Sequence, residues 1–145
     1  MNSEHFQKLE RMYLNANFNK MIYDTTTIQI EEGEAAISLN VTEKYHHALG
    51  AMHGSVYFKL LDDAAFFAVS SLVSDFFVLT TSFNINFVRP VTAGKIIARG
   101  KVRFTSNTLF TAESTLVNEA GKEVAFGTGN FVKSRVKLNQ DIGYV

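Results

Sequence analysis

The sequence has no cysteine and one proline, Pro90, among its 145 residues. The lack of cysteine excludes disulfide bonds, cysteine-ligated metals and a thiol nucleophile. Neither sign of charge is in excess, because 14 basic residues balance 14 acidic ones. This balance gives no indication of a nucleic-acid partner or an anionic membrane surface. We expect residues 1–145 to form one domain, with residues 1–21 as an N-terminal helical segment.

The chain also lacks a long apolar run free of charge. The most apolar stretch, residues 51–74, carries Lys59, Asp62 and Asp63. Each of these charges would cost roughly 2.5–3.5 kcal/mol near the centre of a bilayer, so the stretch is not expected to span one. The N-terminus has no basic start followed by an apolar run, as a signal peptide would. We therefore expect a soluble, cytoplasmic protein with no membrane partner.

The first part of the sequence changes from helical to strand periodicity. Apolar residues at helical spacing within residues 6–16 predict a short amphipathic helix, which Asn2 or Ser3 could cap. This helix is expected to end near the Asn17–Asn19 cluster. Alternation of apolar and polar residues between 27 and 41 then predicts two strands joined by a Glu32–Gly33 turn.

A buried helix and four more strands follow. Residues 56–73 are apolar around nearly the whole circumference of a helix, which is typical of a helix buried on most sides. Short turns between the later strands force antiparallel neighbours, and a single sheet buries one long helix by curling around it. The predicted fold is α+β, a six-stranded antiparallel sheet wrapped around a central helix. In the strand after the helix, we expect one face to carry Phe77, Leu79, Phe83, Ile85 and Phe87, and the other to carry Thr80, Ser82, Asn84 and Asn86.

The carboxylates in the buried helix call for a functional explanation, because burying an ionised carboxylate is costly unless it is paired or used. His53-Gly54-Ser55 lies where the loop should turn into this helix. Free N–H groups at a helix start favour developing negative charge, and a glycine there lets a substrate approach the backbone. Such a site could polarise a carbonyl group, while Asp62 acts as general base or nucleophile.

One chain cannot bring both the helix start at His53 and the carboxylate of Asp62 to the same reacting atom. His53 and Asp62 are nine residues apart, which along one helix is about 13.5 Å and about half a turn out of phase. A two-fold dimer of antiparallel helices would place the helix start of one chain beside the middle of the partner's helix. If both residues are catalytic, the protein must be at least a dimer.

The spacing of these residues resembles a known family. The pattern His47-x-x-Gly50-x-x-His53-Gly54-Ser55, followed by Leu60-Leu61-Asp62, is similar to the hotdog-fold acyl-CoA thioesterases of the phenylacetic-acid-degradation (PaaI-like) group. The stretch Ile85–Val91, with its Arg89-Pro90 turn, and the later Gly94 also resemble that family. The resemblance covers roughly residues 25–134 and implies the hotdog fold.

The resemblance implies roles for individual residues. Asp62 falls at the family's catalytic carboxylate, Gly54 at the N–H that polarises the thioester carbonyl, and His53 at the histidine that helps to hold it. His47 stands where the family usually has Asn or Gln, and Ser55 where it prefers a second glycine. The implied function is hydrolysis of an acyl- or aryl-CoA by a homodimer, which pairs further into a homotetramer. No metal or cofactor is implied beyond the coenzyme A of the substrate.

Structural roles compete with each of these assignments. Asp62 could pair with Lys59 one turn earlier, and Asp63, at i,i+4 from Lys59, is the better candidate for such pairing. His53 could be a plain helix cap, and His47 a surface loop histidine. We expect contacts with the substrate from Ser55, from Asp63 and from Arg89, since arginine suits the phosphates of coenzyme A. No H-x-x-x-H or comparable ligand spacing suggests a metal site.

Two other functions remain open. Dehydration of hydroxyacyl chains would need a histidine with a Pro-Gly nearby, but Pro90 is the only proline. A protein that binds acyl-CoA without turnover is the alternative of a different class. Asp62 distinguishes these possibilities, because a protein that only binds has little reason to keep a free carboxylate beside an oxyanion site.

Overall fold

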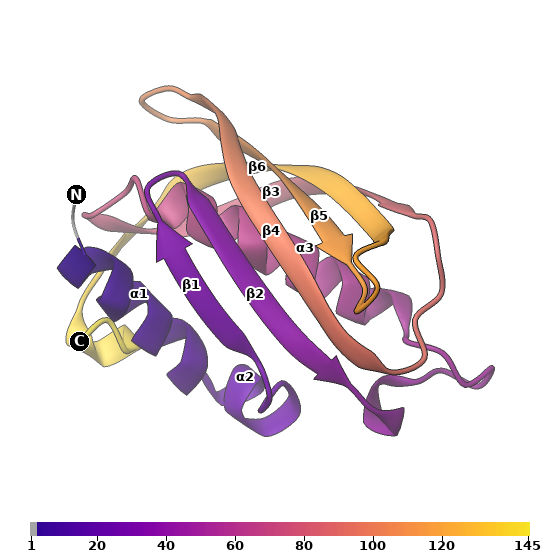
Figure 1. Ribbon diagram of the computed structural model, residues 1–145. Helices are drawn as coiled ribbons and strands as arrows, with labels where there is room; N and C mark the ends of the chain where they lie inside the picture. Colours follow the sequence, from indigo (N-terminus) through magenta and orange to yellow (C-terminus); the bar gives the residue numbers. More distant parts are fainter. Residues whose placement is uncertain (1–2) are drawn as a thin grey trace.

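The computed structural model describes residues 3–145, so the possible cap Asn2 lies outside the described residues (Figure 1). Ser3 is the first residue of helix α1. The elements in chain order are α1 (Ser3–Asn15), α2 (Asn17–Ile22), β1 (Thr27–Glu31), β2 (Glu34–Val41), the 3-10 turn η1 (Glu43–Tyr45), α3 (Gly54–Ser70), β3 (Phe76–Phe87), β4 (Gly94–Thr105), β5 (Phe110–Val117), β6 (Glu123–Lys137) and the 3-10 turn η2 (Gln140–Ile142).

The strands form one antiparallel sheet in the order β1-β2-β4-β5-β6-β3, which curls around α3 (Figure 1). Helix α3 contacts every strand, and Leu60, Leu61 and Ala64 have no exposed surface. The predicted α+β architecture is therefore confirmed. Its helix begins two residues earlier and ends three residues earlier than the apolar pattern indicated.

Helix α3 lies unusually close to the middle of the sheet. A Cβ atom built on Gly100 of β4 would lie 2.2 Å from the carbonyl oxygen of Ala64. Glycine is therefore required at this position, because any side chain would push the helix away from the sheet. This approach fixes the turn of α3 that follows Asp62 and Asp63.

The predicted faces of β3 were wrong over its first half. Val78 is buried, whereas Leu79 is 47% exposed. Thr80, expected on the face opposite the apolar residues, instead donates a hydrogen bond to Asp62 of α3. The pairing with β6 shifts register between Phe76 and Val78 and again between Thr80 and Ser82. The first shift places two extra residues in β6, and the second places one extra residue in β3. The single extra residue reverses the alternation of side chains along β3, which a strict period of two cannot anticipate.

The N-terminal segment is longer than the predicted single helix, since α2 follows α1 after a break at Ala16. The buried His5 side chain joins α1 to the rest of the molecule, through the carbonyl of Ser70 at 2.8 Å and the hydroxyl of Tyr144 at 2.7 Å. The C-terminal residues accordingly lie beside α1 (Figure 1).

The two edges of the sheet differ. Helix α1 lies along β1, and the Ile30 N–H of that strand donates to Glu10 at 2.9 Å. Within residues 3–145, the other edge strand, β3, pairs only with β6. An edge of unpaired N–H and C=O groups is a template for another strand.

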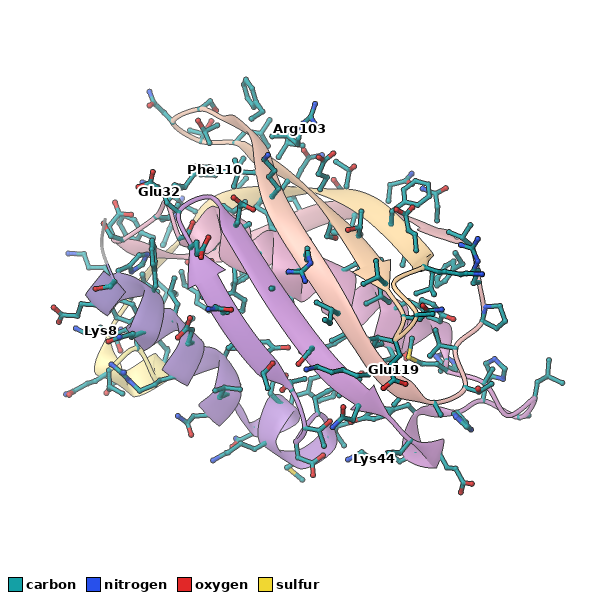
Figure 2. All side chains as sticks on the ribbon, viewed as in Figure 1. Lys8, Glu32, Lys44, Arg103, Phe110 and Glu119 are labelled. Carbon is teal, nitrogen blue, oxygen red and sulfur yellow. The ribbon has the colours of Figure 1, made fainter. Side chains whose placement is uncertain are left out.

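Charged side chains such as Glu32, Lys44 and Arg103 lie near the ends of strands and outside the core (Figure 2). No helix within residues 3–145 is long and apolar enough to cross a membrane.

Candidate active site

His53 caps the start of α3, which is the structural role that the sequence analysis set against a catalytic one. Its backbone is extended, and its Nδ1 accepts a hydrogen bond from the Ser55 N–H at 3.0 Å. The Ser55 hydroxyl also lies 2.8 Å from Nδ1. Because Nδ1 accepts from the backbone, the neutral ring carries its proton on Nε2. The exposed His53 ring therefore presents an N–H donor away from the helix.

The loop before α3 holds a second histidine in the same state. His47 Nδ1 accepts from the Leu49 N–H at 3.1 Å, which again leaves the proton on Nε2. The His47 N–H donates to the Ala51 carbonyl at 2.9 Å, and Gly50 closes the turn with a φ of +81°. The His47 and His53 ring centroids are 6.5 Å apart. This loop brings the two expected histidines together.

A shallow cavity of about 390 Å³ lies at this helix start, lined by His47, Gly54, Phe87 and Arg89 among others. As the first residue of α3, Gly54 has an N–H without an acceptor inside the helix. Arg89 is exposed and donates to the carbonyl of Glu123, while its own carbonyl accepts from the Tyr57 hydroxyl at 2.8 Å. Gly54, His47 and Arg89 thus line one cavity.

Asp62 lies in the middle of α3, away from this cavity. Its Oδ1 accepts a hydrogen bond from the Thr80 hydroxyl of β3 at 2.8 Å. Burial raises the pKa of the Asp62 carboxyl from 3.8 to about 6, opposed by the Thr80 hydrogen bond. The negative charge of Asp63 raises this pKa further, and the positive charge of Lys59 lowers it. Asp62 is therefore a carboxylate whose pKa approaches neutrality, as a general base requires.

Asp63 has different surroundings from its neighbour. Its Oδ2 forms an ion pair with Lys59 and accepts from the Tyr13 hydroxyl at 2.8 Å. Burial raises the pKa of the Asp63 carboxyl, while Lys59 and Tyr13 oppose that shift. The predicted i,i+4 pairing of Asp63 with Lys59 is confirmed. Lys59 donates its hydrogen bond to Asp63, whereas Asp62 accepts its hydrogen bond from Thr80.

Lys59 is itself enclosed by aromatic rings of the N-terminal segment. Its Nζ lies 5.0 Å from the ring centroids of Tyr13 and Tyr23 and 5.4 Å from that of Phe18. Such contacts stabilise an ammonium group through the negative faces of the rings. The energetic cost of burying the Lys59 ammonium is therefore offset by one carboxylate and three aromatic rings.

Asp62 opens into a pocket of about 770 Å³ whose exposed lining is mostly apolar. The residues that line this pocket are Met12, Tyr13, Ala16, Asn19, Lys59, Asp62, Asp63, Phe66, Phe67, Phe77, Leu79, Thr80, Ser134, Val136 and Ile142. None of them lines the shallow cavity at the helix start. A single chain therefore keeps the two expected halves of the site apart.

The sequence did not point to Thr80, because the register shift that turns it inward leaves no mark in the alternation. Tyr13 and Asn19 were missed as well, since their proximity to α3 depends on how the N-terminal segment folds back. The Oδ1 of Asn19 is the buried side-chain atom left without a hydrogen-bond partner in residues 3–145. Across the same residues, no three His, Cys, Asp or Glu side chains gather as metal ligands.

Comparison with known proteins agrees with this fold and places it in a family. The model of the thioesterase superfamily matches residues 49–125. The chain is 35% identical over 72 residues to a 1,4-dihydroxy-2-naphthoyl-CoA hydrolase of Listeria monocytogenes serotype 1/2a (strain 10403S). That match covers 49% of this chain and 58% of the Listeria protein, little more than half of its length.

Solved structures match over more of the chain. The PaaI protein from the phenylacetic acid degradation operon of E. coli superposes with a TM-score of 0.84 at 25% identity, over 94% of this chain and 97% of that one. The zebrafish thioesterase superfamily member 2 superposes with a TM-score of 0.78 at 17% identity, over 89% and 98% of the two chains. With the family match over more than half of its length, the chain belongs to the thioesterase superfamily, as a PaaI-like member with the hotdog fold.

Proposed function

We propose that the protein hydrolyses an acyl- or aryl-CoA thioester to the free acid and coenzyme A. The observation that carries this proposal is the state of Asp62, a partly buried carboxylate with a raised pKa. Its hydrogen bond comes from the Thr80 hydroxyl, while Lys59 pairs with Asp63. A carboxylate kept in this state beside an apolar pocket is suited to take a proton from water.

The reaction needs only protein groups and water. The Gly54 N–H, supported by His53 Nε2–H and His47 Nε2–H, donates a hydrogen bond to the carbonyl oxygen as negative charge develops on it. A water molecule attacks the carbonyl carbon and gives its proton to Asp62. The C–S bond then breaks, and Asp62 returns the proton to the leaving thiolate. Direct attack by Asp62, which forms an anhydride that water hydrolyses, uses the same groups.

We propose that each site is shared by two chains. Within one chain Asp62 and Gly54 line separate cavities. The unpaired edge of β3, twelve residues long, offers a second copy a strand to pair with. Antiparallel pairing there would run two copies of α3 side by side in opposite directions, with Gly54 of one protomer near Asp62 of its partner. Further pairing of dimers into a tetramer remains a prediction.

The substrate class is supported by the relative from Listeria, whose name describes hydrolysis of a naphthoyl-CoA. We place the phosphates of coenzyme A near Arg89, which is exposed beside Gly54. Ser55 contributes by holding His53 through its N–H and hydroxyl. Contact of Asp63 with the substrate remains a prediction, and in this chain its carboxylate is held by Lys59 and Tyr13.

The experiment is thiol release from a panel of acyl- and aryl-CoAs. Asp62→Asn keeps the shape of the side chain and an acceptor for Thr80, but it cannot take a proton. We expect kcat to fall by about a hundredfold or more, the order expected for losing a general base. Asp63→Asn is the matched control and should retain more thioesterase activity than Asp62→Asn. If Asp63→Asn alone were inactive, Asp62 would not be the base. If the wild type bound a CoA ester but hydrolysed none, the chain would be a binding protein.

A further inference from the structure

The pocket beside Asp62 is built from the N-terminal segment, from α3 and β3, and from the C-terminal residues Ser134, Val136 and Ile142. One wall consists of α3 and β3, including Phe66 and Phe77. The opposite wall consists of Met12, Tyr13 and Ala16, at the end of α1 and just beyond it. Its volume of about 770 Å³ lies within the range of small-molecule sites, about 300–1,000 Å³, and far exceeds the need of an acetyl group.

The N-terminal wall is fixed to the helix that carries Asp62. The Tyr13 hydroxyl donates to Asp63, and the Lys59 ammonium lies among the rings of Tyr13, Phe18 and Tyr23. The Lys59 and Asp63 side chains are only 13% and 15% exposed. An ion pair screened from water in this way holds its partners in one geometry. The wall therefore has a defined distance from the carboxylate of Asp62.

The wall also lies outside the region that identifies the family. The family model matches residues 49–125, which include Gly54, Asp62 and Thr80. Residues 12–19 precede that region. The groups proposed to act on the thioester and the groups that enclose the far side of the pocket therefore come from separate parts of the sequence.

We infer that the N-terminal segment, residues 3–23, is the specificity element of the enzyme, and that Ala16 sets the size of the acyl group admitted beside Asp62. The inference rests on the proposed function, because it places the acyl group of the thioester in this pocket. The acyl groups that fit are bulky and apolar, since the aromatic lining and the volume favour them over a short chain. Ala16 is the smallest residue of this wall, so a larger side chain there would occupy space that the acyl group needs.

The test compares Ala16→Leu with Asn17→Leu on a bulky aryl-CoA and on acetyl-CoA. Asn17 is the adjacent residue, is exposed and does not line the pocket, so it controls for added apolar surface on the same segment. We expect Ala16→Leu to lower kcat/KM for the bulky ester by about tenfold or more, the effect of a few misplaced methylene groups in a substrate pocket. Turnover of acetyl-CoA should not change, and Asn17→Leu should resemble the wild type with both esters.

Equal losses on both esters, or an unchanged profile for Ala16→Leu, would overturn the inference. Calorimetric titration of the same variants with the bulky ester separates this inference from the proposed function. If only Ala16→Leu binds the bulky ester more weakly, the role of Ala16 in limiting the acyl group is supported. This holds even if the wild type hydrolyses nothing, in which case only the proposed function fails. If all three proteins bind the bulky ester equally, Ala16 does not limit the size of the acyl group, whether or not the thioester is hydrolysed.

Discussion

Asp62 and Asp63 are neighbours in the sequence, yet their carboxylates accept hydrogen bonds from different groups. Asp62 accepts from the Thr80 hydroxyl of β3, and Asp63 pairs with Lys59 and accepts from Tyr13 of α1. Adjacent residues on a helix point about 100° apart, so each carboxylate contacts a different layer of the molecule. The division leaves one carboxylate neutralised by a cation and the other available for proton transfer.

The raised pKa of Asp62 predicts a cost in stability at neutral pH. Its folded value of about 6 lies above its ordinary 3.8, so the folded state favours the protonated form. Stability from this group is complete below 3.8 and is lost as the pH rises through 6. Asp62→Asn should therefore stabilise the protein above that pKa, by up to about 3 kcal/mol. Urea unfolding at fixed protein concentration on both sides of that pKa measures the effect, and a gain of equal size at both would contradict the assignment.

Thr80 should control the acid limb of the activity profile. Its hydroxyl favours the ionised form of Asp62, so Thr80→Val should raise the pKa of that carboxyl. The fall of kcat/KM at low pH would then begin at a higher pH than in the wild type, because the base is lost sooner. Thr80→Ser keeps the hydroxyl and should restore the wild-type profile. A Val variant that lost activity without any shift of the profile would show that Thr80 only supports packing.

The Lys59–Asp63 pair predicts a coupling energy between α3 and the N-terminal segment. Lys59→Met leaves Asp63 buried without its cation, and Asp63→Leu leaves Lys59 without its carboxylate. Each change should lower the free energy of unfolding by on the order of 3 kcal/mol, because a partly buried charge loses its partner. The double variant should lose much less than the sum of the two. Chemical denaturation of the four proteins gives the coupling, and additive losses would mean that the pair acts as two independent surface charges.

The sequence predicted the order of the elements because their periods differ sharply. The apolar circumference of residues 56–73 indicated a buried helix, and His53-Gly54 was expected at the start of that helix, where the structure has it. The separation of His53 from Asp62 also followed, since the rise of a helix is fixed. These features depend on local geometry, which a single sequence records directly.

Features that depend on distant contacts could not be predicted in the same way. The register shift between Thr80 and Ser82 turns Thr80 toward Asp62, and its position depends on pairing with β6. The aromatic rings around Lys59 come from residues 36 or more positions earlier, and nothing in their spacing indicates that they meet it. The wall of the Asp62 pocket was missed for the same reason.

We propose that each site joins Asp62 of one protomer with Gly54 of its partner, and two inactive variants can test this arrangement. Gly54→Pro removes the N–H proposed to polarise the carbonyl. Proline is well tolerated at the first position of a helix, and the extended backbone of His53 suits a following proline. Gly54→Ala keeps the N–H, and its Cβ would meet the Phe87 ring at an ordinary 3.4 Å, so it is the matched control.

The first measurement is thioesterase activity after co-expression of Asp62→Asn with Gly54→Pro, each shown to be inactive alone. In a mixed dimer one site contains both lesions and the other contains neither, so random pairing should restore about a quarter of the wild-type activity. That recovery would establish a site made by two chains. If the mixed dimers form and remain inactive, Asp62 and Gly54 of the same chain act together, and the shared site is wrong.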